Sequence, residues 1–237
     1  MSETKQIKRL VLFDIDETMI SSDGAGRRAL SRAIDELHSL PEALGSLPMS
    51  GKTDKQILGE IFMAANLGFE GDQLKLEIDR ALERYLHYLD EEIPASKNYI
   101  IHTGIPALLE CLKADPRAFL GLLTGNVAVG AEKKLRRFDL NKYFAMGAFG
   151  SDSANRLDLP AIAVDRAAEQ FQQYFQPHEV VIVGDSVNDI ACAHHYGATA
   201  LIANTGRTTW EELEAHKPKY LFKDLSNLEE VVAAIFN

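Results

Sequence analysis

The sequence predicts an α/β protein in which a parallel sheet forms the core and an all-helical domain is inserted into it. Two observations support this fold class. After a first apolar stretch, Leu10 to Phe13, three amphipathic helical patterns follow with no strand between them. From about residue 103 onward, helical patterns alternate with short apolar stretches. Such alternation is typical of a parallel sheet with helices on both faces, and the helical run is typical of a separate module.

Hydrophobic spacing defines the expected elements. In the helical module it predicts helices over 26–40, 54–67 and 72–89. In the rest of the chain it predicts helices over 105–113, 127–138, 159–174, 188–196 and 225–235, and a further one near Trp210. Strands are expected over 118–123, 144–149, 180–183, 198–202 and 220–222. The core domain is therefore placed over 1–20 and 97–237, and the helical cap domain over 21–96, with hinges near residue 21 and between 96 and 104.

Composition and charge narrow the class of partner. The 237 residues include 25 Lys and Arg against 35 Asp and Glu, a formal net charge of -10. This acidity disfavours nucleic acid or an anionic membrane surface as the main partner. The N-terminus opens polar, no apolar run is long enough to span a bilayer, and Cys111 and Cys192 lack metal-type spacing. We expect a cytoplasmic protein, monomer or homodimer, with both cysteines reduced in the core.

The first strand ends in a cluster of acids. Residues 10–20 read LVLFDIDETMI, so the apolar run passes directly into Asp14, Asp16 and Glu17. Ligands of open α/β sheets bind at the carboxyl ends of the strands, and in extended geometry Asp14 and Asp16 point to the same side. Two close carboxylates repel unless a cation joins them, and an oxygen-rich pair suits Mg²⁺. The alternative is a helix N-cap with acidic residues in its first turn.

Two later strands also end in polar residues. Thr124, Gly125 and Asn126 follow one strand and offer a hydroxyl, a flexible glycine and an amide just before a helix. Such a turn can cradle an anion. The strand over 180–183 runs into GDSVND, which adds Asp185 and Asp189. Each motif alone is also an ordinary helix-capping turn, but three of them at the carboxyl ends of strands predict a binding site.

A DxDxT, a hydroxyl-Gly-Asn and a GDxxxD in this order resemble the haloacid dehalogenase-like (HAD) superfamily. The helical insertion directly after the first motif resembles the cap of that family, in particular of its phosphoglycolate phosphatase-like branch. The resemblance covers essentially the whole chain. It implies a HAD fold with a Rossmann-like parallel sheet. It also implies a Mg²⁺-dependent phosphatase that hydrolyses a small phosphorylated metabolite, a phosphomonoester, through an aspartyl-phosphate.

The first motif would carry the chemistry. By resemblance, Asp14 is the nucleophile, Asp16 is the general acid and then the general base, and Thr18 fixes the geometry of the loop. Both aspartates are also expected as metal ligands, Asp16 through its backbone carbonyl. Glu17 is expected to have neither role. The true dehalogenase branch lacks the acid two residues after the nucleophile, so Asp16 favours phosphate ester hydrolysis over carbon–halogen cleavage.

The other two motifs would supply the contacts to phosphate and metal. By the same resemblance, Thr124 and the amides of Gly125 and Asn126 hold phosphate oxygens. Asp185 completes the Mg²⁺ shell, and Asp189 acts close by, through a bound water or behind the direct ligands. A metal is chemically necessary in such a site, because an anionic carboxylate must approach an anionic phosphate.

The expected cation departs from the family pattern. The family usually has a lysine upstream of GDxxxD, and the matching residue here is Arg156. Arginine can neutralise phosphate and bind it in bidentate fashion, but it is not equivalent to lysine. The alternative is that Arg156 lies on the surface and that Lys133 or Lys134 supplies the charge from the neighbouring helix.

The segment GKT at 51–53 suggests a nucleotide phosphate loop, but this interpretation fails. The spacing from the upstream glycine is one residue too long, Pro48 interrupts it, and no strand precedes it. The same segment resembles the cap loop of phosphoglycolate phosphatase-like members, which closes over the active site. We therefore expect a substrate contact from Lys52, Thr53 or Asp54, with Lys52 as the first choice.

Two other functions are consistent with the motifs. A phosphosugar mutase of the β-phosphoglucomutase type shares all of them, and would need an aspartyl-phosphate that outlives substrate exchange. A non-catalytic phosphometabolite-binding protein is the second, although a pure binder does not need both Asp14 and Asp16. In each case specificity is expected to lie in the cap.

Overall fold

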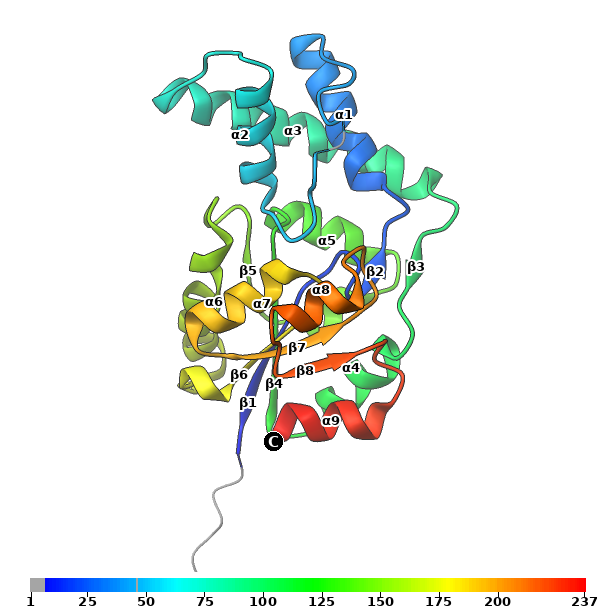
Figure 1. The fold of residues 1–237 in the computed structure, drawn as a ribbon, viewed down its shortest axis with the longest axis vertical. Helices are drawn as coiled ribbons and strands as arrows, with labels where there is room; N and C mark the ends of the chain where they lie inside the picture. The colour runs from blue at the N-terminus through cyan, green and yellow to red at the C-terminus, as the bar shows by residue number, and fades with distance from the viewer. Residues whose placement is uncertain (1–6, 46) are drawn as a thin grey trace, which may run out of the picture.

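The computed structural model describes residues 7–45 and 47–237. Six parallel strands form the central sheet in the order β5-β4-β1-β6-β7-β8 (Figure 1). Their bounds are β1 Arg9–Phe13, β4 Ala118–Thr124, β5 Gly147–Phe149, β6 Val180–Gly184, β7 Thr199–Ala203 and β8 Tyr220–Phe222. The predicted parallel α/β sheet is therefore confirmed.

The central strand β1 is buried on both faces of the sheet. Val11 and Phe13 face a core that is shared with α4 (Ile105–Ala114), α5 (Ala128–Arg136) and α9 (Leu228–Phe236). Leu10 and Leu12 face a core that is shared with α6 (Leu159–Phe171), α7 (Val187–Tyr196) and α8 (Trp210–Ala215). Because successive side chains of a strand point to opposite faces, covering both faces requires the unbroken apolar run seen in the sequence.

Three helices lie between the first strand and the rest of the core. They are α1 (Ala25–His38), α2 (Asp54–Ala64) and α3 (Gly71–Ala95), and α1 packs along α3. In Figure 1 they form a cap above the sheet. Where the chain enters and leaves the cap, β2 (Ile20–Ser21) and β3 (Ile100–Ile101) pair as antiparallel strands. The sequence did not predict these two short strands. The domain bounds at 21 and 96 stay a prediction.

Several elements differ from their expected bounds. The helix α2 ends at residue 64 and not at 67, because Asn66 and Gly68 adopt left-handed backbone conformations. The helix α3 continues to residue 95, since Ile93 extends its buried stripe by one turn beyond Leu89. The strand β5 begins only at residue 147, after a 3₁₀ helix over Leu140–Tyr143. Two further 3₁₀ helices span Arg156–Asp158 and Pro177–Glu179.

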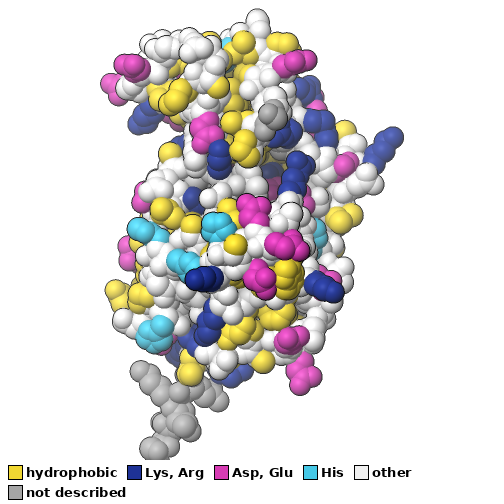
Figure 2. All heavy atoms as spheres, viewed as in Figure 1, with side chains coloured by type: hydrophobic (Ala, Val, Ile, Leu, Met, Phe, Trp, Pro, Cys, Tyr) yellow, Lys and Arg dark blue, Asp and Glu magenta, His cyan; other side chains and the backbone are white. Residues whose placement is uncertain are grey.

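The surface carries mixed charge. On the face shown in Figure 2, Lys and Arg side chains are scattered over cap and core, while acidic side chains gather near α8, which contributes Glu211, Glu212 and Glu214. Of the two free cysteines, Cys192 is buried as expected, but Cys111 is only half-buried. Within the described residues, no helix combines the length and hydrophobicity needed to cross a bilayer.

Candidate active site

The three polar motifs meet at one edge of the sheet. In the sheet β1 lies between β4 and β6, and Phe13 pairs with Leu122 on one side and Val183 on the other. Since the strands are parallel and in register, the turns after them leave the sheet at the same edge. The first residue beyond β1 is still attached there, because Asp14 N–H donates to the carbonyl oxygen of Val183 at 2.9 Å.

The loop after β1 is a tight backbone turn. The N–H groups of Met19 and Ile20 both donate to the carbonyl oxygen of Ile15, at 2.9 and 3.1 Å. Thr18 is fully buried, and its hydroxyl donates to Asp185 Oδ1 at 2.9 Å, which joins this loop to the end of β6. The Glu17 carboxylate instead accepts from the hydroxyl of Ser21 at 3.1 Å. The geometry thus agrees with the loop-fixing role expected of Thr18.

Arg156 lies between two buried aspartates. Its Nη2 is 3.2 Å from Asp14 Oδ2 and 2.5 Å from Asp189 Oδ1. All three residues are buried, with at most 5% of each exposed. The 3₁₀ helix that holds the arginine is capped by Asn155, whose side chain accepts from Leu157 N–H. The guanidinium is therefore not on the surface, and it contacts the carboxylate that is expected to be the nucleophile.

Asp189 closes the turn after β6. Its Oδ2 accepts from the N–H of Asp185 at 3.2 Å, and from the N–H and the hydroxyl of Ser186 at 3.0 and 2.6 Å. These contacts form a capping box at the start of α7. Both carboxylate oxygens of Asp189 are thus engaged, one by the backbone turn and one by Arg156. This arrangement fits a residue that acts from behind the direct ligands.

The Asp16 carboxylate has a different cation. Lys134 Nζ lies 2.9 Å from Asp16 Oδ1 and 2.7 Å from Oδ2. Asn126 Nδ2 donates to Asp16 Oδ2 at 2.8 Å. The two carboxylates therefore have different side-chain cations, Arg156 for Asp14 and Lys134 for Asp16.

The role of Lys134 beside Asp16 was missed from the sequence. The sequence predicts Lys134 only as an alternative to Arg156. A signal was present, because Lys134 falls at helical spacing with the buried residues Val127, Ala131 and Leu135. A lysine on the apolar face of a helix is rarely buried without an acidic partner.

The turn after β4 lies directly against Asp16. Thr124 is fully buried, and its hydroxyl oxygen accepts from Asn126 Nδ2 at 2.8 Å. The carbonyl oxygen of Asn126 accepts from the N–H of Gly150 at 2.8 Å, which ties the turn to the end of β5. The structure therefore brings the expected phosphate cradle, including Gly125, next to the expected proton carrier.

The cap loop before α2 rests on this cradle. Asp54 N–H donates to the carbonyl oxygen of Gly125 at 2.8 Å, and Asp54 Oδ2 accepts from Val127 N–H at 2.8 Å. The hydroxyl of Thr53 donates to the carbonyl oxygen of Ala154 at 2.7 Å. A Cβ at Gly125 would collide with the backbone carbonyl of Lys52, so this close approach requires glycine.

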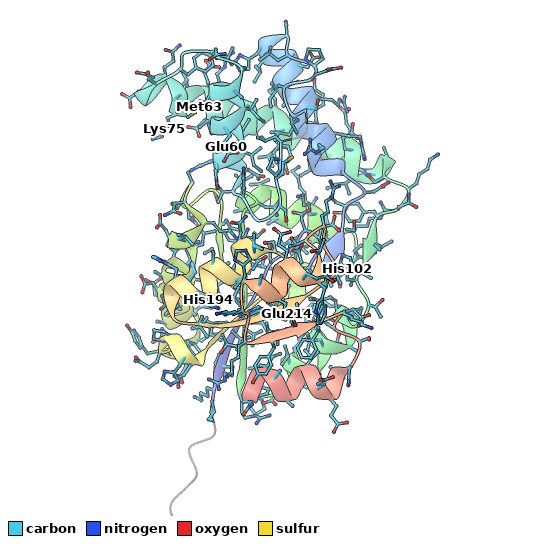
Figure 3. The ribbon with its side chains drawn as sticks, viewed as in Figure 1. Glu60, Met63, Lys75, His102, His194 and Glu214 are labelled. Carbon is cyan, nitrogen blue, oxygen red and sulfur yellow. The ribbon has the colours of Figure 1, made fainter. Side chains whose placement is uncertain are left out.

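The Lys52 side chain turns toward the cap. Its Nζ lies 2.5 Å from Glu60 Oε2, on the helix α2 (Figure 3). The loop is nevertheless seated on the core close to Asp16, so a role for Lys52 in binding substrate stays a prediction. His194, also labelled in Figure 3, is exposed on α7, as is the neighbouring His195.

Comparison with known proteins identifies the family. The model of the haloacid dehalogenase-like hydrolases matches residues 8–197. The chain belongs to this family. The matched segment contains the three motifs, Arg156 and the whole cap, as the resemblance in the sequence suggested.

Relatives of this HAD-like hydrolase include enzymes named for one substrate. A phosphoglycolate phosphatase of Vibrio vulnificus (strain YJ016) is 26% identical, covering 97% of this chain and 98% of the relative. One from Mannheimia succiniciproducens is 24% identical, covering 94% of this chain and 98% of the relative.

Solved structures show the same fold. A predicted phosphoglycolate phosphatase from Haemophilus somnus is 21% identical with a TM-score of 0.70, covering 97% of this chain and 99% of that one. CbbY from Rhodobacter sphaeroides, in complex with phosphate, is 18% identical with a TM-score of 0.66, covering 93% and 96%. At these identities the likeness concerns the fold.

The acidic cluster of this HAD-like hydrolase fits a hard divalent cation. Asp14, Asp185 and Asp189 each offer an oxygen, and these atoms lie within 4.8 Å of one another. Asp185 Oδ2 is buried without a hydrogen-bond partner. Burial raises the pKa of Asp185 well above its usual range, and the charges of Asp189 and Asp14 raise it further. An all-oxygen set with an unsatisfied carboxylate suits Mg²⁺.

Arg156 only partly offsets the crowding of these acids. Burial raises the pKa of Asp14 to about 6, and the Arg156 guanidinium opposes this shift. Two buried carboxylates contact the guanidinium, and Asp185 lies in the same acidic cluster without a cation of its own, so the cluster keeps excess negative charge. A bound divalent cation would balance that excess, which is a second reason why the residues present fit Mg²⁺.

Asp54 makes the stability of the folded protein dependent on pH. Burial raises the pKa of Asp54 to about 6, although the Lys134 charge and the Val127 N–H lower it. In the unfolded chain an aspartate titrates near pH 4. Between about pH 4 and pH 6 the folded protein thus keeps a proton that the unfolded chain has released. The free energy of unfolding therefore falls as the pH rises through this range.

Asp54→Asn is expected to remove this fall in unfolding free energy with pH, because the amide does not titrate. The amide oxygen can still accept the hydrogen bond from Val127 N–H. Relative to wild type, the variant should gain up to about 3 kcal/mol in unfolding free energy between pH 4 and pH 7. Urea unfolding in EDTA at a series of pH values measures the difference. Asp72→Asn, at an exposed position of α3, is the matched control. A difference between Asp54→Asn and wild type that stays constant with pH would contradict the expectation.

Proposed function

We propose that this HAD-like hydrolase is a Mg²⁺-dependent phosphatase that hydrolyses a small phosphomonoester metabolite through an aspartyl-phosphate on Asp14. The observation that carries the proposal is that the Asp14 and Asp16 carboxylates pair with different cations and so lie in different surroundings. Asp14 lies among the acids with Arg156, and Asp16 lies with Lys134 beside the cradle. One carboxylate can thus attack phosphorus while the other handles the proton.

In the first step, an Asp14 oxygen attacks phosphorus and the bond from phosphorus to the ester oxygen breaks. The leaving oxygen takes a proton from Asp16. Thr124 and the backbone amides of Gly125 and Asn126 hold the phosphoryl oxygens, and Arg156 adds positive charge next to the nucleophile. The seated cap loop keeps bulk water away while the ester is intact.

In the second step, Asp16 takes a proton from water as the water oxygen attacks phosphorus, and the aspartyl-phosphate bond breaks. Phosphate is released and Asp14 is restored. Asp14, Asp185 and the backbone carbonyl of Asp16 would hold Mg²⁺, with Asp189 behind them. The bound ion supplies positive charge that offsets the repulsion between an anionic carboxylate and an anionic phosphate.

Phosphoglycolate is the first substrate to test, because the relatives described above are named phosphoglycolate phosphatases. The cap loop at 50–54 is the proposed specificity element, with Lys52 as its cation. We also propose a cytoplasmic location. The protein is proposed to be a monomer or homodimer, since a cap that opens on its own core needs no second subunit.

The test is phosphate release from a panel of small phosphomonoesters. We expect release by the wild-type protein with Mg²⁺, loss of release with EDTA and recovery when Mg²⁺ is restored. Phosphate release without net isomerisation of a phosphosugar distinguishes a hydrolase from a mutase. No phosphate release from any member of a broad panel in the presence of Mg²⁺ would overturn the proposal and favour a binding protein.

A further inference from the structure

Lys134 is a buried lysine whose hydrogen-bonding capacity is fully used. It is 4% exposed, and its three ammonium donors meet three acceptors. These are both carboxylate oxygens of Asp16 and, at 2.6 Å, Asn126 Oδ1. Burial works against its charged form, but the Asp16 and Asp54 carboxylates outweigh this and raise the pKa of Lys134 above its usual value.

The backbone also fixes this lysine. The hydroxyl of Tyr99 donates to the carbonyl oxygen of Lys134 at 2.9 Å. Tyr99 is buried, and it stands where the chain returns from the cap. This hydrogen bond joins the segment that returns from the cap to the helix that carries Lys134.

The Asp16 carboxylate keeps one weakly occupied position. An ionised carboxylate accepts about four hydrogen bonds. Lys134 and Asn126 supply three of them, all at 2.9 Å or less. The fourth partner, the hydroxyl of Ser22, is 3.5 Å from Oδ1, at the limit of a hydrogen bond. A substrate oxygen can therefore replace this contact without displacing the lysine.

We propose that Lys134 is a positioning residue for the proton transfer by Asp16, an inference that rests on the phosphatase function proposed above. As the bond from phosphorus to the ester oxygen breaks, the electron pair stays on the leaving oxygen, which takes the proton of the Asp16 carboxyl group. The carboxylate that remains lies beside the ammonium of Lys134. The lysine orients the acid before the transfer and stabilises the charge that the transfer creates.

The test compares substrates that differ in their need for a proton. An alkyl phosphomonoester, such as phosphoglycolate, must have its leaving oxygen protonated, whereas 2,4-dinitrophenyl phosphate releases a stable anion. For Lys134→Met, kcat/KM should fall by about 10²-fold or more with the alkyl ester but by less than about 10-fold with the dinitrophenyl ester. This parameter reports the first chemical step, in which Asp16 acts as the acid.

Two further variants keep the inference falsifiable. Lys134→Met introduced into Asp16→Asn should cause no additional loss, because a residue that acts through Asp16 has nothing left to position. Should Lys134→Met fail to fold, Gly26→Ala is the substitute. A Cβ at Gly26, inside α1, would lie 3.2 Å from Lys134 Nζ and displace it without opening a cavity. Gly26→Ala should lower kcat/KM by less than Lys134→Met does, and again more with the alkyl ester than with the dinitrophenyl ester.

Equal losses with both esters, no loss with either, or additive losses in the double variant would overturn the role of Lys134 while leaving the phosphatase function intact. A wild-type protein that hydrolyses neither ester would instead overturn the proposed function, and the inference with it. The two failures are therefore distinguishable.

Discussion

Asp14→Asn is expected to abolish phosphate release, with kcat lowered by about 10⁴-fold or more. An amide oxygen is a poor nucleophile and cannot form the aspartyl-phosphate. The fold should survive, since asparagine has nearly the same shape and its substitution removes a buried carboxylate whose pKa burial raises to about 6. Steady-state kinetics on the best substrate, together with thermal unfolding, measure both effects.

Glu17→Gln is the matched control for this prediction. Glu17 is an acid in the same loop, but its carboxylate accepts from Ser21 and lies outside the cluster of Asp14, Asp185 and Asp189. We expect its kcat to stay within a few-fold of wild type. Near-normal turnover by Asp14→Asn, or equal losses in the two variants, would show that Asp14 is not the nucleophile.

Arg156→Met is expected to cause the largest loss of stability, about 3–5 kcal/mol in the free energy of unfolding. The methionine leaves Asp14 and Asp189 buried without the cation that contacts both. The pKa of Asp14 should also rise further, because the opposing charge is gone. Guanidinium chloride unfolding in the presence of EDTA measures the loss without a contribution from bound metal.

Arg156→Lys separates the charge from the shape of the guanidinium. Both ion pairs come from the single atom Nη2, and Arg156 Nε is buried without a partner. One ammonium can therefore replace the two contacts and removes the unpaired Nε. We expect Arg156→Lys to keep most of the stability that Arg156→Met loses. Equal destabilisation of the two variants would mean that packing, and not charge, holds this residue in place.

The sheet and the three motifs could be predicted because they depend on local signals. An unbroken apolar run predicts a strand that is buried on both faces, and a polar break after it marks the edge where ligands bind. Asp14, Thr124 and Asp185 are each within two residues of such a break. Once the strands are parallel neighbours, their ends must meet, so the approximate site follows from the order of the elements.

The partners of the acids could not be predicted in the same way. Which carboxylate Lys134 meets depends on how α5 is rotated and how closely it packs, and hydrophobic spacing determines this only roughly. The hinge strands around Ile20 and Ile100 are two residues long, too short for a recognisable alternation. The left-handed conformation of Asn66 accounts for the early end of α2. It could not be predicted, because apolar spacing carries no information about the backbone conformation of a single residue.

Beside the side chains of Thr53 and Asp54, the backbone of the cap loop also holds it on the core. Asp54 N–H binds the carbonyl of Gly125, the carbonyl of Ser50 accepts from Asn188 Nδ2 at 2.9 Å, and the carbonyl of Lys52 packs on Gly125. None of these three contacts uses the side chain of Ser50 or Lys52. Substitutions of these two side chains are therefore expected to leave the loop seated on the core. With the specificity role proposed for Lys52, the substrate range of the enzyme could change in evolution, or in the laboratory, without a change in how the loop sits on the core.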